Sequence, residues 1–150
     1  MKRIAFFAAL AIGLLGATHS ATAPGITFID HDKVSAAFAK GMPLIEVGGY
    51  KIHASRREGP GAVEVHTRDT DIVYVLDGTA TLVLGGEMAG GKTIAPEEIR
   101  GTSIRNGQVR TIVKGDVLVI PNNTPHWFQK VPGPMTYYVV KVRSAEGGSK

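Results

Sequence analysis

From about residue 44 to residue 143 the chain repeats one pattern, in which short runs of alternating apolar and polar residues are separated by glycine, proline and asparagine. Runs such as IVYVL, TATLVL and TYYVVKV are rich in β-branched and aromatic residues, which favour strands. The pattern therefore predicts an all-β, antiparallel sandwich or barrel. A jelly roll is the natural choice, because closing two sheets together leaves few exposed edges.

One segment ahead of the strands has a helical period instead. In DHDKVSAAFAKGMP, residues 30–43, Asp30 or Asp32 can cap a helix, and Gly41 with Pro43 ends it. Two connections between strands also carry expectations. The polar segment GGEMAGGKTIAPEEIRG, residues 85–101, is interpreted as a loop over the surface, and Asn106-Gly107 predicts a two-residue hairpin.

The N-terminus resembles a secretory signal peptide. Lys2 and Arg3 precede an apolar run from Ile4 to Leu15, which is short of the roughly 20 residues of a membrane-spanning helix, and small residues follow. We expect cleavage that removes residues 1–23, although an uncleaved anchor is the alternative. The remaining chain divides into a helix and arm over 24–43, a barrel over 44–143 and a flexible tail over 144–150, and we expect it in the periplasm or secreted, without stable membrane association.

The composition excludes two classes of function. Lys2 and Arg3 account for two of the 17 basic residues, which leaves 15 against 13 acidic ones with no basic block, so nucleic-acid binding is not expected. The chain has no cysteine, so disulfides and thiolate chemistry are excluded. Any metal must be bound through nitrogen and oxygen.

Polar residues gather where two of the predicted strands meet. In the strand AVEVH, alternation places Glu64 and His66 on one face, and Asp71 begins the next run after a short turn. If the turn returns the strand that begins at Asp71 beside the strand AVEVH, Asp71 can face the same interior as His66. Farther along the chain, His126 follows the turn PNNTP and begins another strand.

The spacing of these residues resembles the two sequence motifs of the cupin superfamily. His66, Asp71 and Gly78 stand at positions of the first motif, although Asp71 replaces a glutamate and Glu64 stands where a histidine is expected. Gly115, Pro121 and His126 match the second motif, with substitutions inside and after it. In the first motif, Glu58 stands where the leading glycine is expected. In the second motif, Asn123 replaces a glycine and Lys130 replaces the final asparagine. The resemblance implies a double-stranded β-helix, which is a jelly-roll barrel.

The resemblance also implies a metal inside the barrel. Cupins typically bind a divalent ion through three histidines and a glutamate, and the matching positions here are Glu64, His66, Asp71 and His126. Such nitrogen and oxygen ligands suit Fe(II), Mn(II), Ni(II) or Zn(II). Glu64 could bind the metal, act as a catalytic general base or pair with an arginine. The alternative is a degenerate cupin without a metal.

Three further residues are candidates for substrate binding. Arg57 could hold a substrate carboxylate, although it could also be a solvated strand end or a partner of Glu64. Phe128 shares the face of His126. One of the two adjacent tyrosines at 137 and 138 should face inward, and we choose Tyr138.

The function that this set favours is a small exported enzyme acting on a small organic substrate, with dioxygenase-like chemistry preferred from the resemblance. The rival is a non-catalytic protein that binds a metal or a small ligand. An interaction protein that uses residues 85–101 is a third possibility. A homodimer is also expected, since single-domain cupins commonly pair through their sheets.

Overall fold

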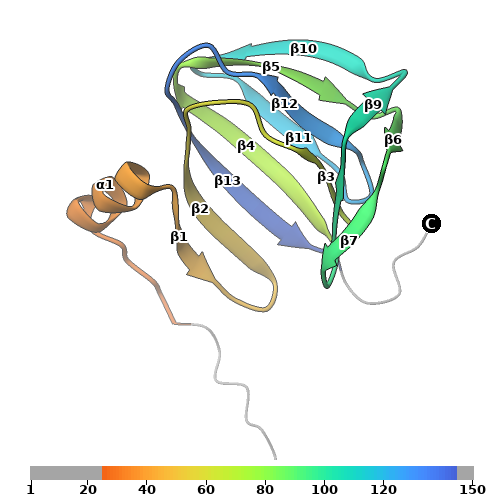
Figure 1. Cartoon of the computed structure of the whole chain (residues 1–150). Coiled ribbons are helices and arrows are strands. Elements are labelled where there is room, and N and C mark those ends of the chain that lie inside the picture. The colour runs from red at the N-terminus through yellow and green to blue at the C-terminus, as the bar shows by residue number, and fades with distance from the viewer. Residues whose placement is uncertain (1–24, 145–150) are drawn as a thin grey trace, which may run out of the picture.

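The computed structural model describes residues 25–144, and these form a barrel of antiparallel strands preceded by one helix (Figure 1). The predicted signal peptide, residues 1–23, lies outside the described residues, as does the tail from residue 145. Within residues 25–144 no helix is long and apolar enough to cross a membrane. The elements are α1 (His31–Lys40), β1 (Met42–Glu46), β2 (Tyr50–Arg57), β3 (Val63–His66), β4 (Asp69–Asp77), β5 (Thr79–Leu84), β6 (Glu87–Ala89), β7 (Lys92–Ala95), β8 (Glu98–Gly101), β9 (Ser103–Arg105), β10 (Gln108–Val113), β11 (Val117–Ile120), β12 (His126–Lys130) and β13 (Met135–Arg143).

The predicted helix is confirmed, with both of its ends. Asp30 is the N-cap, since its side chain accepts a hydrogen bond from the backbone N–H of Lys33 at 2.9 Å. Gly41 ends the helix in the left-handed conformation, with φ of 65°. Phe38 lies edge-on against Tyr138, with the ring centres 4.9 Å apart, so the helix packs on the outer side of β13.

The strands form two main sheets and a short ribbon, and these confirm the all-β antiparallel prediction. One sheet has the order β1-β2-β13-β4-β11, the other has β10-β5-β12-β3-β8-β7, and β6 pairs with β9. The link after β3 crosses from one sheet to the other, so β4 does not pair with β3. His66 and Asp71 therefore face each other across the interior, rather than side by side on one sheet.

The hydrophobic core fills one end of this interior. Its fully buried side chains include Val75, Leu82 and Met135, and it continues through Phe128 and Tyr137 toward the polar residues. Gly78 turns the chain from β4 into β5 with φ of 83°, and a Cβ there would stand 2.6 Å from the carbonyl oxygen of Pro134.

Two expectations about the connections are wrong. The segment 85–101 is not a loop, because it forms β6, β7 and β8, and β8 pairs with β3 in the second sheet. Asn106-Gly107 does not make a hairpin, because β9 pairs with β6 while β10 pairs with β5. Of these two residues, only Asn106 has a positive φ, of 57°, whereas the predicted turn needs a positive φ at both. The glycine is needed for space, since a Cβ at Gly107 would stand 2.6 Å from a methyl group of Val83.

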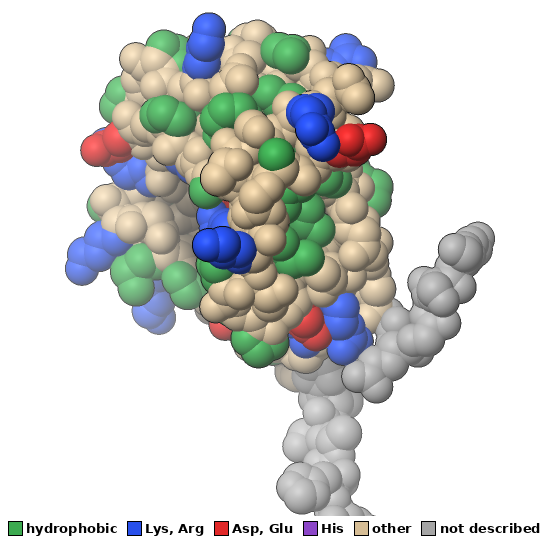
Figure 2. All heavy atoms as spheres, turned by 45° about the vertical axis from the view of Figure 1, so that its right-hand side comes forward, with side chains coloured by type: hydrophobic (Ala, Val, Ile, Leu, Met, Phe, Trp, Pro, Cys, Tyr) green, Lys and Arg blue, Asp and Glu red, His purple; other side chains and the backbone are tan. Residues whose placement is uncertain are grey.

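The face of the molecule in Figure 2 mixes basic, acidic and apolar side chains. On the face shown in Figure 2, lysine and arginine side chains are scattered among apolar and acidic ones and form no continuous basic area. A protein that binds nucleic acid through its backbone needs clustered cations. This face does not offer that cluster.

Candidate metal site

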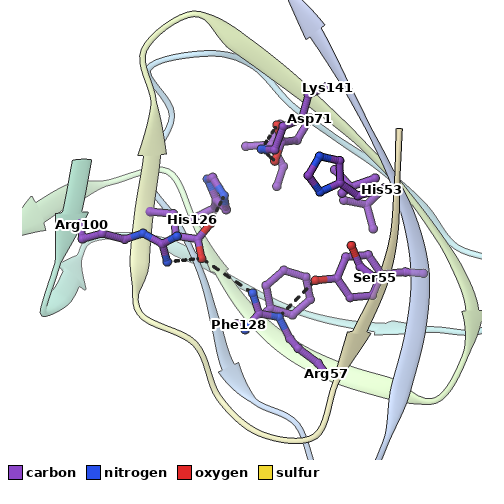
Figure 3. Close-up of a pocket in the computed structure, with 13 residues that line it drawn as sticks. His53, Ser55, Arg57, Asp71, Arg100, His126, Phe128 and Lys141 are labelled. Atoms are coloured by element: carbon purple, nitrogen blue, oxygen red, sulfur yellow. Dashed lines mark hydrogen bonds and ion pairs between the residues drawn. The ribbon is translucent and has the colours of Figure 1, made fainter. Parts of the chain in front are cut away.

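A pocket of about 220 Å³ lies between the two sheets, next to the core residues Val73, Phe128, Tyr137 and Val139 (Figure 3). It is unusually polar for a space between two sheets. Its lining residues come from both sheets: His53, Ser55, Arg57, Glu64, Asp71, Val73, Arg100, Ile120, His126, Phe128, Tyr137, Val139 and Lys141. The strand alternation explains this lining, since every second residue of β2, β4 and β13 points inward.

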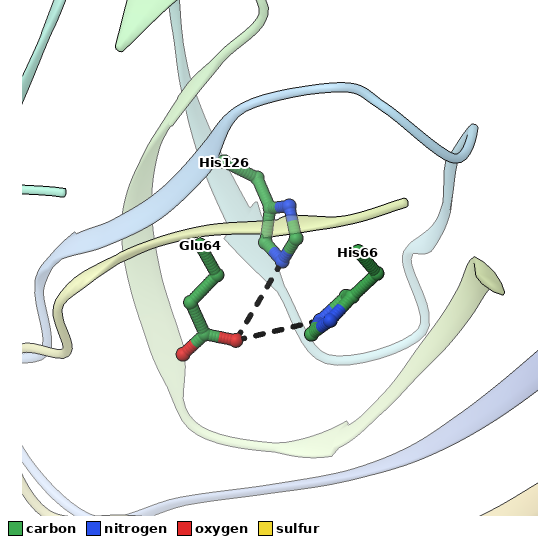
Figure 4. A group of neighbouring side chains, drawn as sticks. All are labelled: Glu64, His66 and His126. Carbon is green, nitrogen blue, oxygen red and sulfur yellow. Dashed lines mark ion pairs between the residues drawn. The ribbon is translucent and has the colours of Figure 1, made fainter. Parts of the chain in front are cut away.

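Glu64, His66 and His126 converge beside this pocket, and Glu64 and His126 line it (Figure 4). One ligand atom from each of the three lies within 4.8 Å of the other two. Glu64 Oε2 is 3.6 Å from His66 Nε2 and 3.8 Å from His126 Nε2. Register explains the convergence, because His126 on β12 pairs directly with Glu64 on β3.

Both imidazoles present a free nitrogen to this group. Nδ1 of His126 lies 3.1 Å from the carbonyl oxygen of Thr124, which can only accept, so Nδ1 carries the hydrogen and Nε2 presents its lone pair. Burial lowers the pKa of His126, which favours the neutral ring. His66 Nε2 is the one buried side-chain nitrogen or oxygen among the described residues that has no hydrogen-bond partner.

The two oxygens of Glu64 have different surroundings. Oε1 accepts a hydrogen bond from Arg100 Nη1 at 2.6 Å and lies 3.7 Å from Arg57 Nη2, while Oε2 faces the two histidines. Burial by itself raises the pKa of Glu64. The His66 ring 3.6 Å from Oε2 and the positive charges of Arg100 and Arg57 outweigh burial and lower this pKa to about 2. Glu64 is therefore a carboxylate at neutral pH.

Arg100 is a site residue that the sequence analysis missed. It stands on β8, opposite Glu64 on β3, and its Nε also donates to Glu98 at 2.7 Å. The alternation of charge in Glu98-Ile99-Arg100 could have identified this strand. The breakers on both sides concealed it.

Asp71 faces the same pocket but is already paired. Both of its oxygens accept from Lys141 Nζ, at 2.8 and 2.7 Å, and Oδ2 is 3.5 Å from His66 Nε2. Lys141 and Asp71 lie on the side of the pocket away from Arg57 and Phe128 in Figure 3. The three-residue group Glu64, His66 and His126 does not include Asp71, so Asp71 as a metal ligand stays a prediction.

Two of the three candidates for substrate binding line the pocket, and the third does not. Arg57 and Phe128 line the pocket, and the guanidinium carbon of Arg57 lies 4.4 Å over the centre of the Phe128 ring. Tyr138 points to the outer face of β13, where it packs on Phe38. Tyr137 lines the pocket in its place, stacked on Phe128 with ring centres 5.4 Å apart, which corrects the choice of Tyr138.

The group Glu64, His66 and His126 fits a divalent metal ion. Metal–ligand bonds of about 2.1 Å place two ligands of one ion at most about 4.2 Å apart, and the two histidine–glutamate pairs satisfy that limit. The unpartnered His66 Nε2 is the observation that a metal would explain. Two imidazoles and one carboxylate suit the first-row ions expected from the sequence.

Comparison with known proteins places the chain in a family. The family model described as Cupin matches residues 29–146, and no match was found among curated proteins. The solved structure of the Bacillus halodurans protein BH2720 is similar with a TM-score of 0.55 and 12% identity, over 82% of this chain and 86% of that one. The Neisseria meningitidis protein NMB1881 gives a TM-score of 0.50 and 13% identity, over 73% of this chain and 95% of that one.

These identities show a common fold and nothing about activity. The fold, the two motif segments around His66 and His126 and the family model agree with one another. The chain belongs to the cupin family.

Proposed function

We propose that this chain is an exported cupin enzyme that binds one divalent metal ion through Glu64, His66 and His126 and acts on a small organic substrate. The observation that carries the proposal is the buried, unpartnered Nε2 of His66 beside two further ligand atoms. A dioxygenase-like reaction is preferred. Two histidines and one carboxylate are the ligand set of non-haem iron oxygenases, which leaves coordination positions open.

The residues of the chain have separate tasks in this proposal. His66, His126 and Oε2 of Glu64 would hold the ion, and a bound ion would act as a Lewis acid or activate O₂. Arg100 holds the other oxygen of Glu64 and fixes the orientation of the carboxylate. The carbonyl of Thr124 orients His126 in the same way. The rings of Phe128 and Tyr137 exclude water from one wall.

Metal content tests the proposal directly. The mature protein is stripped with a chelator, reconstituted separately with Fe(II), Mn(II), Ni(II) and Zn(II), and analysed by mass spectrometry of the bound element. We expect stoichiometric metal in the wild type and in His53→Ala, because His53 lines the pocket but pairs with Glu46. The double variant His66→Ala with His126→Ala should lose the metal. Negligible metal in the wild type, or unchanged metal in the double variant, would overturn the proposal.

Oxygen consumption tests the reaction class. The Fe(II) protein is assayed with a panel of aromatic and diketone compounds, and we expect substrate-dependent uptake that disappears on chelation. Activity that survives removal of the metal would contradict a metal-dependent reaction.

Export is supported by the pattern of Lys2, Arg3, the apolar run to Leu15 and the small residues after it. The test is expression of the full chain in a bacterium, fractionation of the cells and determination of the N-terminal residue. We expect a periplasmic protein that begins between residues 18 and 24. A cytoplasmic protein that retains Met1 would exclude export.

A non-catalytic binding protein is the second candidate, and the environment of Glu64 favours it over an enzyme with Glu64 as general base. A base with a pKa of about 2 is far from the operating pH at which proton transfer is efficient. If the protein only binds its ligand, Glu64→Gln would change the affinity for the metal, and there would be no catalysed reaction for the substitution to slow. If Glu64 is a general base, the same variant would lose about 10²-fold or more in kcat.

A further inference from the structure

The guanidinium of Arg57 is held firmly before any ligand binds. Its Nε donates to the hydroxyl of Tyr137 at 3.2 Å, and its carbon lies 4.4 Å over the centre of the Phe128 ring. Its Nη1 lies against Gly61, where a Cβ would stand only 2.5 Å away. The side chain is 22% exposed. These contacts fix the plane of the group and point it into the pocket (Figure 3).

The Nη groups of Arg57 have donors to spare. Within residues 25–144 neither Nη nitrogen donates a hydrogen bond, and the carboxylate within ion-pair distance is Glu64, whose Oε1 is 3.7 Å from Nη2. That oxygen already accepts from Arg100 at 2.6 Å. Arg100 is therefore the primary partner of Glu64, and Arg57 retains two Nη groups facing the pocket.

The charges around the pocket favour an anion. Its lining contains three cationic side chains and two carboxylates. Lys141 is neutralised by Asp71 at 2.7 Å, and Arg100 is shared between Glu64 and Glu98. Arg57 is the lining cation without a carboxylate at hydrogen-bond distance. A divalent ion at the histidines would make the pocket still more positive, which attracts anionic ligands.

We propose that Arg57 is the binding site for a carboxylate group of the substrate, so the substrate is a small organic carboxylate. This inference rests on the proposed function in that the same pocket would bind both metal and substrate. A guanidinium fork matches a carboxylate with two parallel hydrogen bonds, which an ammonium group cannot do. The stacked rings of Phe128 and Tyr137 provide an apolar wall for the carbon part of the ligand. The volume of about 220 Å³ restricts it to a small molecule.

The test compares carboxylates with their neutral amides. Acetate, oxalate and benzoate, and acetamide, oxamide and benzamide, are titrated into metal-free and Zn(II)-loaded protein and followed by two-dimensional NMR. At least one carboxylate should bind the metal-free protein tenfold or more tightly than its amide, since hydrogen bonds to charged groups are worth about 1.5–3 kcal/mol. Equal binding of every acid and its amide would overturn the proposal.

Two variants locate the effect, and a third is the matched control. Arg57→Gln removes the charge, and Gly61→Ala keeps the charge but places a methyl group where Nη1 lies. Both should weaken carboxylate binding at least tenfold. Arg56→Gln should leave it unchanged, because Arg56 pairs with Glu58 at 2.7 Å and does not line the pocket. Carboxylate binding that Arg57→Gln leaves unchanged would refute the assignment.

The metal measurement separates this inference from the proposed function. If the metal-free protein binds a carboxylate through Arg57 but the chain binds no metal, the proposed function fails and the carboxylate site stands. If the chain binds metal through its histidines but discriminates no acid from its amide, the metal site stands and the carboxylate site fails.

Discussion

Arg100 reaches from β8 to Glu64 on β3, and its Nη1 lies 2.6 Å from Oε1. The contact leaves Oε2 of the same carboxylate directed at His66 and His126. A single glutamate is thus both an arginine partner and a candidate ligand, and these two roles do not compete because they use different oxygens.

Arg100→Met should weaken metal binding. Groups that orient a ligand typically contribute about 10- to 100-fold to metal affinity, and Arg100 holds the Glu64 carboxylate. Competition with a chelating dye measures the dissociation constant. Arg105→Met is the control, since Arg105 forms an exposed ion pair with Glu87 at 3.5 Å. Equal affinity of the Arg100 variant and the wild type would show that Arg100 does not position the ligand.

The contribution of Glu64 to stability should disappear in acid. Its pKa falls from an ordinary value of 4.5 to about 2 on folding, so the ionised form stabilises the fold above pH 4.5, and this stabilisation is lost as the pH falls toward 2. It amounts to no more than about 3 kcal/mol. Urea unfolding of metal-free wild type and Glu64→Gln at pH 7, 5, 4 and 3 should show a difference that narrows below pH 4.5. A constant or widening difference would contradict the low pKa.

Lys141→Met should be strongly destabilising, because it leaves Asp71 as an unpaired charge with only 8% of its side chain exposed. Removing one partner of such a pair costs about 3 kcal/mol. Adding Asp71→Asn should recover part of this loss, with a coupling of at least about 1 kcal/mol in a double-mutant cycle. Additive effects of the two substitutions would refute the coupling.

The variant Asp71→Asn also tests whether Asp71 is a metal ligand. If Lys141 keeps Asp71 from the ion, metal affinity should fall less in Asp71→Asn than in Glu64→Gln. An equal or greater loss in the Asp71 variant would make Asp71 a ligand.

A glycine can be required by a positive φ alone or also by a lack of space for a Cβ atom, and Gly115 and Gly78 allow the two costs to be measured separately. Both have positive φ, of 83° and 91°, but a Cβ at Gly78 would stand 2.6 Å from Pro134 O, while nothing lies within 4 Å of one at Gly115. Gly115→Ala should cost about 1–2 kcal/mol, from the backbone conformation alone. Gly78→Ala should cost at least about 3 kcal/mol, since steric conflict with backbone is added. Chemical unfolding measures both, and equal costs would mean that the turn relaxes.

The strands with clear alternation could be predicted from the sequence, and those without it could not. β4, β5 and β13 carry regular apolar faces, so their existence followed from the period of two, which also puts Asp71 on one face with Val73 and Val75. β7 is exposed at every position, and β8 is short and charged. β8 takes its place in the sheet by pairing with β3, and β7 takes its place by pairing with β8, and no local pattern records either pairing.

Alternation also cannot tell which face of a strand is the interior. On β13 the face with Tyr138 and Val140 is more apolar than the face with Lys141, yet Lys141 points inward. The helix explains this reversal, because Phe38 covers Tyr138 from outside. An ion pair with Asp71 then allows Lys141 inside. Both contacts join residues far apart in the chain.

Every charged or imidazole side chain that lines the pocket stands on a hydrogen-bonded strand: His53 and Arg57 on β2, Glu64 on β3, Asp71 on β4, Arg100 on β8, His126 on β12 and Lys141 on β13. Because the two sheets fix these backbones, the chemistry of the pocket depends on side-chain identity and little on loop conformation. The barrel is accordingly a good starting scaffold for directed evolution. A library that varies these positions in compensating pairs should yield folded proteins with altered ligand preference.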